Sequence, residues 1–285
     1  MPFQPSSQAY LGSHRLLNAI GSGRHCAVWD AMVDAKGERR AIKILLKLER
    51  EQIQLMRHEF AVAQGLDHPN VIHIYEFNIH QETPYLAMEY FPSINLKQYL
   101  LQYKVEKLQP QLNSILVQAA LGLGYFHDRG WVHRDIKPDN YLISEDIRIK
   151  LIDFALAEKK KSFFSGLLGG RGRAIQGTRS YMSPEQIRGE GLDQRSDIYS
   201  YACTAYELVT GRLPFTGSNT NELLNKHLKS TPPPLEMHNK LVTPGFSALM
   251  KKMLSKKPSD RPANLSEVAA EIKAHGVVKG GEVNF

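Results

Sequence analysis

The sequence contains only two cysteines, Cys26 and Cys203, which lie far apart along the chain. Such a pair provides neither a disulfide framework nor a cluster of thiolate ligands for a metal, and it suits a reducing environment. The sequence also lacks a signal peptide, an apolar run long enough to span a bilayer, internal repeats and low-complexity tracts. We therefore expect a soluble, cytoplasmic chain without a membrane segment.

The charge balance is moderately basic. Thirty-six Lys and Arg residues against 29 Asp and Glu residues give a net charge of +7. This excess is compatible with binding of a nucleotide or an acidic substrate, but it does not require a nucleic-acid partner, and we expect none. A chain of 285 residues can bury a substantial core and form two lobes around a cleft.

A polar stretch from His133 to Asn140 stands between two apolar patterns. The apolar run 141–143 follows it, and a helix pattern precedes it, with apolar residues at Leu112, Ile115, Leu116, Ala119, Leu123 and Phe126. The stretch is too polar for a strand or for the apolar face of a helix. It therefore predicts a loop between packed elements.

Three side chains in and after this loop suit phosphoryl transfer. Asp135 can accept the proton of a hydroxyl, and Asn140 can hold a hard cation through its oxygen. Asp153 ends a short apolar strand pattern just before Phe154, and its carboxylate can hold a cation in the same way.

The motif His-Arg-Asp-x-Lys-Pro-x-x-Asn and the following Asp-Phe resemble the catalytic loop and metal-binding strand of eukaryotic-type Ser/Thr protein kinases. Segments 177–185 and 193–200 also resemble this family, and their Ser-Pro-Glu and Arg-Ser-Asp-Ile-Tyr-Ser forms look most like its bacterial members. The resemblance extends from about Tyr10 to His275. It implies an α+β, protein-kinase-like bilobal fold with a small antiparallel-sheet lobe and a larger, mainly helical lobe.

On this basis we divide the chain into a kinase domain at residues 10–275 and two tails. The small lobe comprises residues 10–91 and the large lobe residues 92–275. Residues 1–9 are polar and contain proline, whereas residues 276–285 are rich in glycine. We expect both tails to be loosely held.

The segment 20–28 has the pattern of a turn between two strands. Glycines in the run Gly21, Ser22 and Gly23 would let backbone N–H groups approach phosphate oxygens closely. A Gly-x-Gly by itself is more often only a tight hairpin. Here Lys43 follows on the next apolar strand, and the resemblance implies that this lysine contacts the nucleotide phosphates.

Residues 49–66 have a helical pattern, with one apolar face formed by Ile53, Met56, Phe60 and Ala63. The resemblance implies that Glu59 of this helix pairs with Lys43. A solvated surface glutamate is the ordinary alternative, because charged helix residues are mostly exposed.

Two further strands, 71–77 and 85–90, would complete the small sheet. The second resembles the strand that leads into the hinge beneath adenine, with Met88 at the back of the pocket. Backbone groups of Glu89 and Phe91 would bind the adenine, because a hinge presents N–H and C=O groups. Three apolar residues, which could equally be plain core residues, would enclose the ring: Val28, Ala41 and Leu142.

The resemblance implies a role for each polar residue of the site. Asp135 orients the substrate hydroxyl and accepts its proton, while Lys137 neutralises the transferring phosphoryl group. Thr178 ties its own segment to Asp135. Asn140 and Asp153 hold Mg²⁺, with Mn²⁺ as the alternative metal, against the phosphates of ATP. The implied acceptors are Ser and Thr hydroxyls of proteins.

Two structural contacts are implied as well. Glu185 would pair with Arg261 as a buried carboxylate–guanidinium fork. Asp197 would brace the His133–Asn140 loop from a buried helix.

Two departures from the family pattern leave other interpretations open. Cys26 replaces the third glycine of the turn, and Ala155 replaces the glycine after Asp-Phe, which would suit a pseudokinase that serves as a nucleotide-binding scaffold. Alanine restricts access to positive φ, but it removes no metal ligand.

A small-molecule kinase of related fold is a third interpretation, although the long segment before Ser-Pro-Glu favours a polypeptide substrate. Cys26 is either a reactive thiol near Arg24 or an inert residue in a glycine position.

The segment between Asp153 and Glu185 is strongly basic. Such a run is usually only solvated. In the family, however, an arginine before the catalytic aspartate, here Arg134, marks kinases switched by phosphorylation of this segment. We predict autophosphorylation at Ser162 or Ser165, with the phosphate paired to Arg134 and higher activity afterwards. We also predict a preference for acidic or neutral peptides over basic ones.

Overall fold

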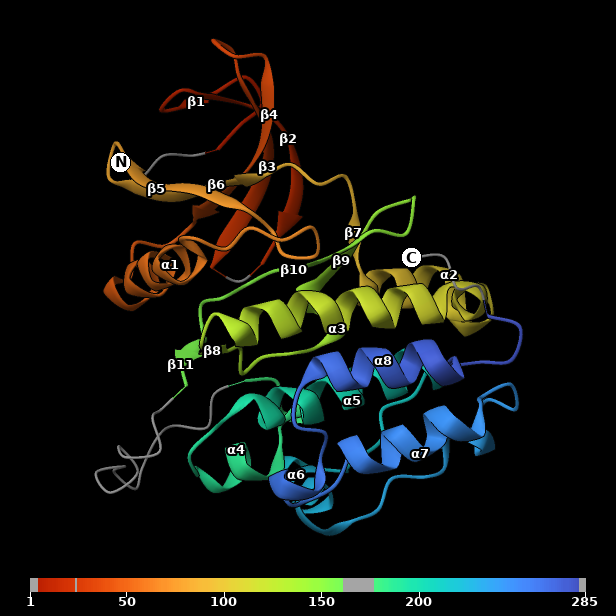
Figure 1. The fold of residues 1–285 in the computed structure, drawn as a ribbon. Coiled ribbons are helices and arrows are strands. Elements are labelled where there is room, and N and C mark those ends of the chain that lie inside the picture. Colours follow the sequence, from red (N-terminus) through yellow and green to blue (C-terminus); the bar gives the residue numbers. More distant parts are fainter. Residues whose placement is uncertain (1–4, 24, 161–176, 282–285) are drawn as a thin grey trace. The chain divides into compact units, whose positions relative to one another are not determined.

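The computed structural model describes residues 5–23, 25–160 and 177–281. The chain forms two compact units (Figure 1). We call them the sheet unit (Met1–His68, Ile72–Pro92 and Asp153–Ala155) and the helical unit (Pro69–Val71, Ser93–Ile152 and Leu156–Phe285).

The sheet unit is built on six antiparallel strands in the order β1-β2-β3-β4-β6-β5. The strands are β1 (Tyr10–Leu11), β2 (His14–Ser22), β3 (Cys26–Val33), β4 (Glu38–Leu45), β5 (Ile74–His80) and β6 (Thr83–Glu89). Ile42 and Ile44, which alternate along β4, face one buried cluster around Tyr85. The antiparallel sheet predicted for the small lobe is confirmed.

Helix α1 (Arg50–Ala63) packs against β5 and β6 of this sheet. It is shorter than the predicted span of 49–66, because the backbone leaves the helical region at Gln64 and Gly65 has a φ of +80°. The predicted apolar face is partly confirmed, because Met56 and Ala63 are buried and Ile53 and Phe60 are half-buried. The buried side of the helix also includes Glu59 and Val62. Glu59 therefore points into the unit instead of into solvent.

The helical unit contains α2 (Leu96–Leu108), α3 (Leu112–Asp128), α4 (Pro184–Arg188), α5 (Gln194–Thr210), α6 (Thr220–Lys229), α7 (Pro244–Met253) and α8 (Leu265–His275). Figure 1 shows α8 alongside α3, and the two helices pack together. The sequence explains this contact, because Leu265, Val268, Ala269 and Ile272 recur at helical spacing and are all buried.

Short elements connect the helices. They are β7 (Ile94–Asn95), β8 (Trp131–Val132), β9 (Tyr141–Ile143), β10 (Ile149–Leu151), β11 (Glu158–Lys159) and a 3₁₀ turn at Pro138–Asn140. Strands β7, β9 and β10 form one small sheet, and β8 pairs with β11. The loop predicted from His133 to Asn140 thus lies between β8 and β9.

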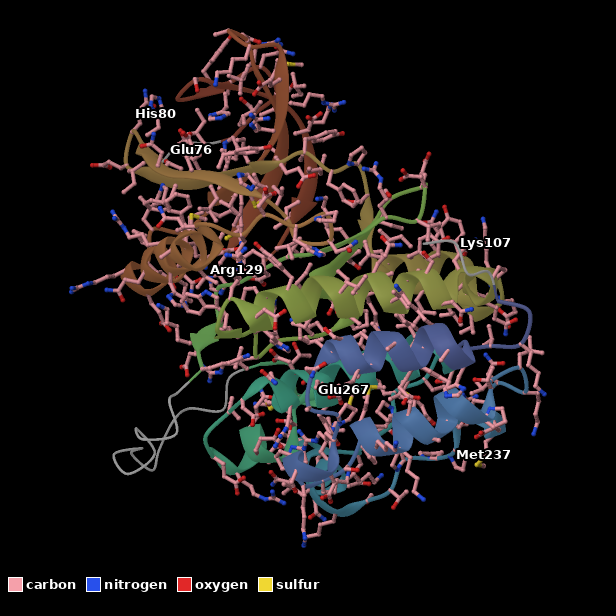
Figure 2. The ribbon with its side chains drawn as sticks, viewed as in Figure 1. Glu76, His80, Lys107, Arg129, Met237 and Glu267 are labelled. Atoms are coloured by element: carbon pink, nitrogen blue, oxygen red, sulfur yellow. The ribbon has the colours of Figure 1, made fainter. Side chains whose placement is uncertain are left out.

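The surface of the helical unit carries charged side chains such as Lys107 and Glu267 (Figure 2). None of the helices in the described part of the chain combines the length and the apolarity needed to cross a bilayer.

The loosely held tail predicted from residue 276 is wrong for Val277 and Val278. Both side chains are buried, and the N–H of Val277 donates to Asn113 Oδ1 at 2.6 Å. The carbonyl of Val277 accepts from the N–H of Thr243 at 3.0 Å. These contacts fix the chain against α3 and α7, so glycine content alone does not indicate a free end here.

Candidate active site

The carboxylate of Asp135 is held from two directions within the helical unit. Its Oδ1 accepts hydrogen bonds from the N–H of Thr178 at 2.9 Å and from the Thr178 hydroxyl at 3.1 Å. Its Oδ2 accepts from the ammonium of Lys137 at 2.7 Å. Burial alone would raise the pKa of Asp135, but the Lys137 charge and these hydrogen bonds bring it below its ordinary value. The group is therefore ionised at neutral pH.

Lys137 and Thr178 also contact each other, because Lys137 Nζ donates to Thr178 Oγ1 at 2.8 Å. The preceding Gly177 has a φ of +111°, and a Cβ atom there would lie 3.1 Å from the carbonyl oxygen of Arg134. Glycine is therefore required before Thr178, because it permits the backbone conformation and the close approach that bring Thr178 to Asp135.

Asn140 is buried at the end of the 3₁₀ turn. Its Nδ2 donates to the backbone carbonyl of Asp135 at 2.7 Å. The amide nitrogen is directed to the loop, so the side-chain oxygen is the atom suited to a hard cation.

Asp197, on α5, braces this loop as predicted. Its buried carboxylate accepts from the N–H of His133 at 2.7 Å and from the N–H of Arg134 at 2.8 Å. His127 Nε2 lies 2.8 Å from the same carboxylate. Burial opposes ionisation of Asp197, but its histidine and backbone partners lower its pKa below the ordinary value. Arg134 has a φ of +72°, which is uncommon for a non-glycine residue. The hydrogen bonds to Asp197 keep the loop in this conformation.

The predicted fork between Glu185 and Arg261 is confirmed. Arg261 Nη1 and Nη2 lie 2.6 and 2.9 Å from the two carboxylate oxygens, and both side chains are buried. Glu185 lies in the first turn of α4, whose N-cap Ser183 forms a capping box with Gln186. The Ser-Pro-Glu motif therefore supplies both the N-cap of α4, Ser183, and the buried carboxylate of Glu185.

In the sheet unit, Lys43 and Glu59 form the expected ion pair. Lys43 Nζ donates to Glu59 Oε2 at 2.7 Å, and Asp153 Oδ1 lies 3.8 Å from the same nitrogen. Burial disfavours the Lys43 charge, but the two carboxylates outweigh burial and raise the pKa of Lys43 above its ordinary value. The lysine is therefore a fixed cation, which is the state needed for contact with phosphate.

Asp153 has a φ of +67°, and its side chain is 40% exposed. Ala155, two residues later, is not among the residues with positive φ. Alanine at this position therefore adopts its conformation without the cost that a left-handed backbone would impose.

The remaining residues predicted for the nucleotide site in the sheet unit lie on β2, β3, β4 and the end of β6. Gly21, Ser22 and Gly23 are exposed, and the N–H of Gly23 donates to the carbonyl of Cys26 at 2.8 Å. Ala41 pairs with Met88 across β4 and β6, and Val28 is half-buried on β3.

Of the hinge residues, Glu89 ends β6 and Phe91 lies two residues after it. The N–H of Glu89 donates to the carbonyl of His73 at 2.8 Å, and Phe91 is buried. Leu142 lies on β9 of the helical unit, where it pairs with Lys150 and Asn95. Arg24, Ser162 and Ser165, which entered the predictions on cysteine reactivity and phosphorylation, lie outside the described residues.

Sequence reasoning missed a buried network near the loop. Glu207 on α5 accepts a hydrogen bond from Lys97 on α2 and, at 2.5 Å, one from the hydroxyl of Tyr181. It also missed the pairing of Arg134 with Glu158. Neither contact carries a motif, because each joins segments that are separate in the sequence.

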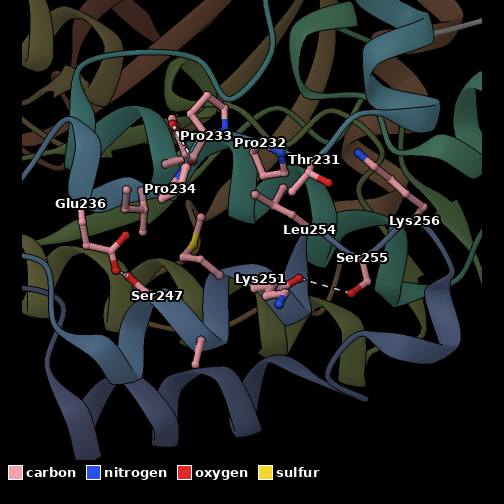
Figure 3. A pocket seen from close by; sticks show the side chains of 14 residues that line it. Thr231, Pro232, Pro233, Pro234, Glu236, Ser247, Lys251, Leu254, Ser255 and Lys256 are labelled. Atoms are coloured by element: carbon pink, nitrogen blue, oxygen red, sulfur yellow. Dashed lines mark hydrogen bonds between the residues drawn. The ribbon is translucent and has the colours of Figure 1, made fainter.

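A cavity of about 570 Å³ lies elsewhere in the helical unit (Figure 3). It is lined by the proline segment Pro232–Pro234 and by residues of and after α7, including Ser247, Leu254 and Lys256. None of the residues predicted for the active site lines it, so the cavity is separate from the phosphoryl-transfer chemistry.

Within the two units, the structure groups the predicted residues into two sets. One set joins Asp135, Lys137 and Thr178 with Asn140, and the other joins Lys43 and Glu59 with Asp153. A loop carboxylate with a lysine two residues later, together with a strand lysine paired to a helix glutamate, defines the protein kinase class of phosphotransferases.

Comparison with known proteins leads to the same result. The protein kinase domain family matches residues 14–278, and the chain belongs to this family. It is 31% identical to the serine/threonine-protein kinase PrkC of Bacillus subtilis over 92% of the chain and 40% of that protein.

Two other bacterial relatives are similar. The chain is 33% identical to serine/threonine-protein kinase PknB of Mycolicibacterium smegmatis over 76% of the chain and 35% of that protein. It is 31% identical to serine/threonine-protein kinase pkn3 of Myxococcus xanthus over 95% of the chain and 52% of that protein. The chain thus spans about half or less of the length of these relatives.

Proposed function

We propose that this chain transfers the γ-phosphoryl group of ATP to Ser and Thr hydroxyls of proteins, and that it phosphorylates itself. The observation that carries the proposal is the hydrogen-bonded set of Asp135, Lys137 and Thr178. The names of the bacterial relatives, all serine/threonine-protein kinases, support the same substrate class.

Asp135 acts on the acceptor hydroxyl. Its carboxylate is ionised and fixed, so it can accept a hydrogen bond from the hydroxyl and orient the oxygen toward the phosphorus. Because its pKa is low, it is a weak base, and it takes the proton only as the new O–P bond forms. Orientation therefore contributes more than proton abstraction from the free alcohol.

Lys137 supplies positive charge beside this carboxylate. Its ammonium is bonded to Asp135 and Thr178 at once, so it stays within reach of the phosphoryl group that arrives at the hydroxyl. A cation fixed before the reaction stabilises the developing negative charge without reorganisation.

The sheet unit would bind the nucleotide. Lys43, held by Glu59, would contact the phosphates, and the backbone of residues 21–23 would cover them. Glu89 and Phe91 would bind adenine through backbone groups. Val28, Ala41 and Met88 would contact the ring, and Leu142 of the helical unit would contribute a further apolar surface.

Asn140 and Asp153 fit a hard divalent cation, because each presents a side-chain oxygen, and the Asn140 nitrogen is already bonded to the loop. Within the described residues, no three His, Cys, Asp or Glu side chains gather as a metal site, which suits a cation that takes its other ligands from phosphates and water. A Mg²⁺ or Mn²⁺ ion held by these oxygens would supply positive charge that neutralises the phosphates. Within the helical unit Asn140 is bonded to Asp135, and within the sheet unit Asp153 lies beside Lys43.

The alternatives lose support. Ala155 needs no positive φ, and all the polar residues that a transferring kinase requires are present. Of the two departures, only Cys26 still favours a scaffold that merely binds nucleotide, and it leaves all those polar residues in place. A small-molecule kinase finds no support among the relatives named above. Because the reaction consumes ATP, we place the domain in the cytoplasm.

The test is the mass of the intact chain, and of an added protein rich in Ser and Thr, after incubation with Mg²⁺ and ATP. We expect mass increases of whole phosphates for the wild type and none for Asp153→Ala. Asp153 is 40% exposed, so this variant should keep the fold, which its circular dichroism melting curve will show. Asp146→Ala, in an exposed turn, is the matched control. ATP hydrolysis without a phosphorylated protein would overturn the proposal.

A further inference from the structure

Arg134 has an acidic partner that the sequence motif does not reveal. Its Nη1 lies 2.5 Å from Oε1 of Glu158, the first residue of β11. The Arg134 side chain is only 9% exposed, whereas that of Glu158 is 37% exposed. A nearly buried guanidinium is thus paired with a carboxylate that still reaches solvent.

The pair is fixed by backbone pairing. Val132 and Trp131 of β8 are in register with Glu158 and Lys159 of β11. The N–H of Lys160 also donates to the carbonyl of Gly130 at 2.8 Å. Because Glu158 is opposite Val132, two residues before Arg134, the strand pairing brings its carboxylate close to the guanidinium.

Arg134 requires an anion for a physical reason. Guanidinium stays charged at all ordinary pH values, and burying it without a counter-charge is costly. Its Nε is buried and has no hydrogen-bond partner among the described residues. Removing the Glu158 carboxylate would therefore leave the buried Arg134 guanidinium without the negative charge that it is paired with.

Arg134 is also coupled to the reacting group. Its backbone N–H is held by Asp197, and its carbonyl accepts from Gln186 Nε2 at 2.8 Å. Its left-handed backbone directs the chain into Asp135, the next residue. A displaced Arg134 side chain would strain a segment that sets the position of the Asp135 carboxylate.

We propose that Glu158 is a built-in counter-ion for Arg134, which supports the geometry of Asp135 without phosphate. This inference rests on the kinase activity proposed above. It revises the expectation that phosphorylation raises activity by pairing a phosphoserine with Arg134, because the described residues already supply the negative charge. A phosphate elsewhere in the chain would compete with Glu158 for the guanidinium.

The test compares phosphatase-treated and autophosphorylated protein, each verified by intact mass. For the wild type we expect kcat of the two forms to agree within about threefold. Glu158→Gln keeps the shape of the side chain and removes its charge. In the phosphatase-treated form of this variant, kcat should fall about tenfold, because that factor corresponds to the free energy of one charge-assisted hydrogen bond. Phosphorylation should restore most of this loss, since a new anion can replace the missing carboxylate. The KM for ATP should not change.

Glu190→Gln is the matched control, because Glu190 is exposed and pairs only loosely with Arg188 at 3.9 Å. In an Arg134→Met background, Glu158→Gln should cause no additional loss, because the two residues act as one pair. Equal activity of phosphatase-treated wild type and Glu158→Gln would overturn the inference. A loss that phosphorylation does not restore would also overturn it, since that result indicates a merely structural role. Failure of the wild type to transfer phosphate in any state would instead reject the proposed function.

Discussion

Thr178 contacts Asp135 through two separate donors. Its backbone N–H and its hydroxyl both reach Oδ1, at 2.9 and 3.1 Å, and the same hydroxyl accepts a hydrogen bond from Lys137. One side chain thus links the segment before α4 to both charged residues of the loop. The segment that carries Thr178 and the loop that carries Asp135 are therefore positioned together.

Replacement of Thr178 should distinguish the contribution of its hydroxyl to activity from that of its backbone N–H. Thr178→Val keeps the shape but removes both hydroxyl hydrogen bonds, so we expect kcat to fall about tenfold or more with little change in the KM for ATP. Thr178→Ser keeps the hydroxyl and should stay close to wild type. Steady-state kinetics with one protein substrate provide the measurement. A Thr178→Val enzyme with unchanged kcat would show that the backbone N–H alone suffices.

The polar residues of this loop were predictable because their order matches the catalytic-loop motif of the protein kinase family, and Asp135 and Asn140 also suit phosphoryl transfer by residue type. Asp135, Lys137 and Asn140 lie within one short segment, and their contacts follow from that segment. The pair of Lys43 and Glu59 was predictable only through the family resemblance, since a helix glutamate is usually exposed.

The buried fork between Glu185 and Arg261 should govern stability. Arg261→Met leaves the Glu185 carboxylate buried without its partner, and we expect a loss of about 3–5 kcal/mol in the free energy of unfolding. Urea denaturation monitored by circular dichroism measures it. Arg188→Met, at a site that is 43% exposed, should change stability by less than about 0.5 kcal/mol. A loss for Arg261→Met as small as that of the control would mean that the fork is energetically neutral.

Cys26 should behave as an ordinary thiol. Its environment in the sheet unit is half-buried, and burial raises its pKa above the ordinary value near 9.0, with Lys43 opposing this only in part. Little thiolate is therefore present at pH 7, and alkylation by iodoacetamide should be slow there and accelerate only above about pH 9. Cys26→Gly should retain wild-type turnover. Rapid alkylation at pH 7 that nucleotide slows would support the reactive interpretation instead.

Three features could not be predicted from local pattern. Lys97 and Glu207 meet across α2 and α5, and Arg134 meets Glu158 through the pairing of two two-residue strands. Such short strands have no periodicity to recognise. Val277 lies in a glycine-rich end, and only the tertiary contact with Asn113 reveals that it is buried.

The central claim is that Asp135 acts on the hydroxyl acceptor during transfer. Asp135→Asn is nearly isosteric, so it changes the charge at one position and leaves Lys43 and its pairing with Glu59 in place. We predict that kcat for phosphorylation of an added protein falls by about 100-fold or more, while the Kd for ATP, measured by calorimetry, changes less than about twofold. Wild-type turnover by Asp135→Asn would contradict the mechanism.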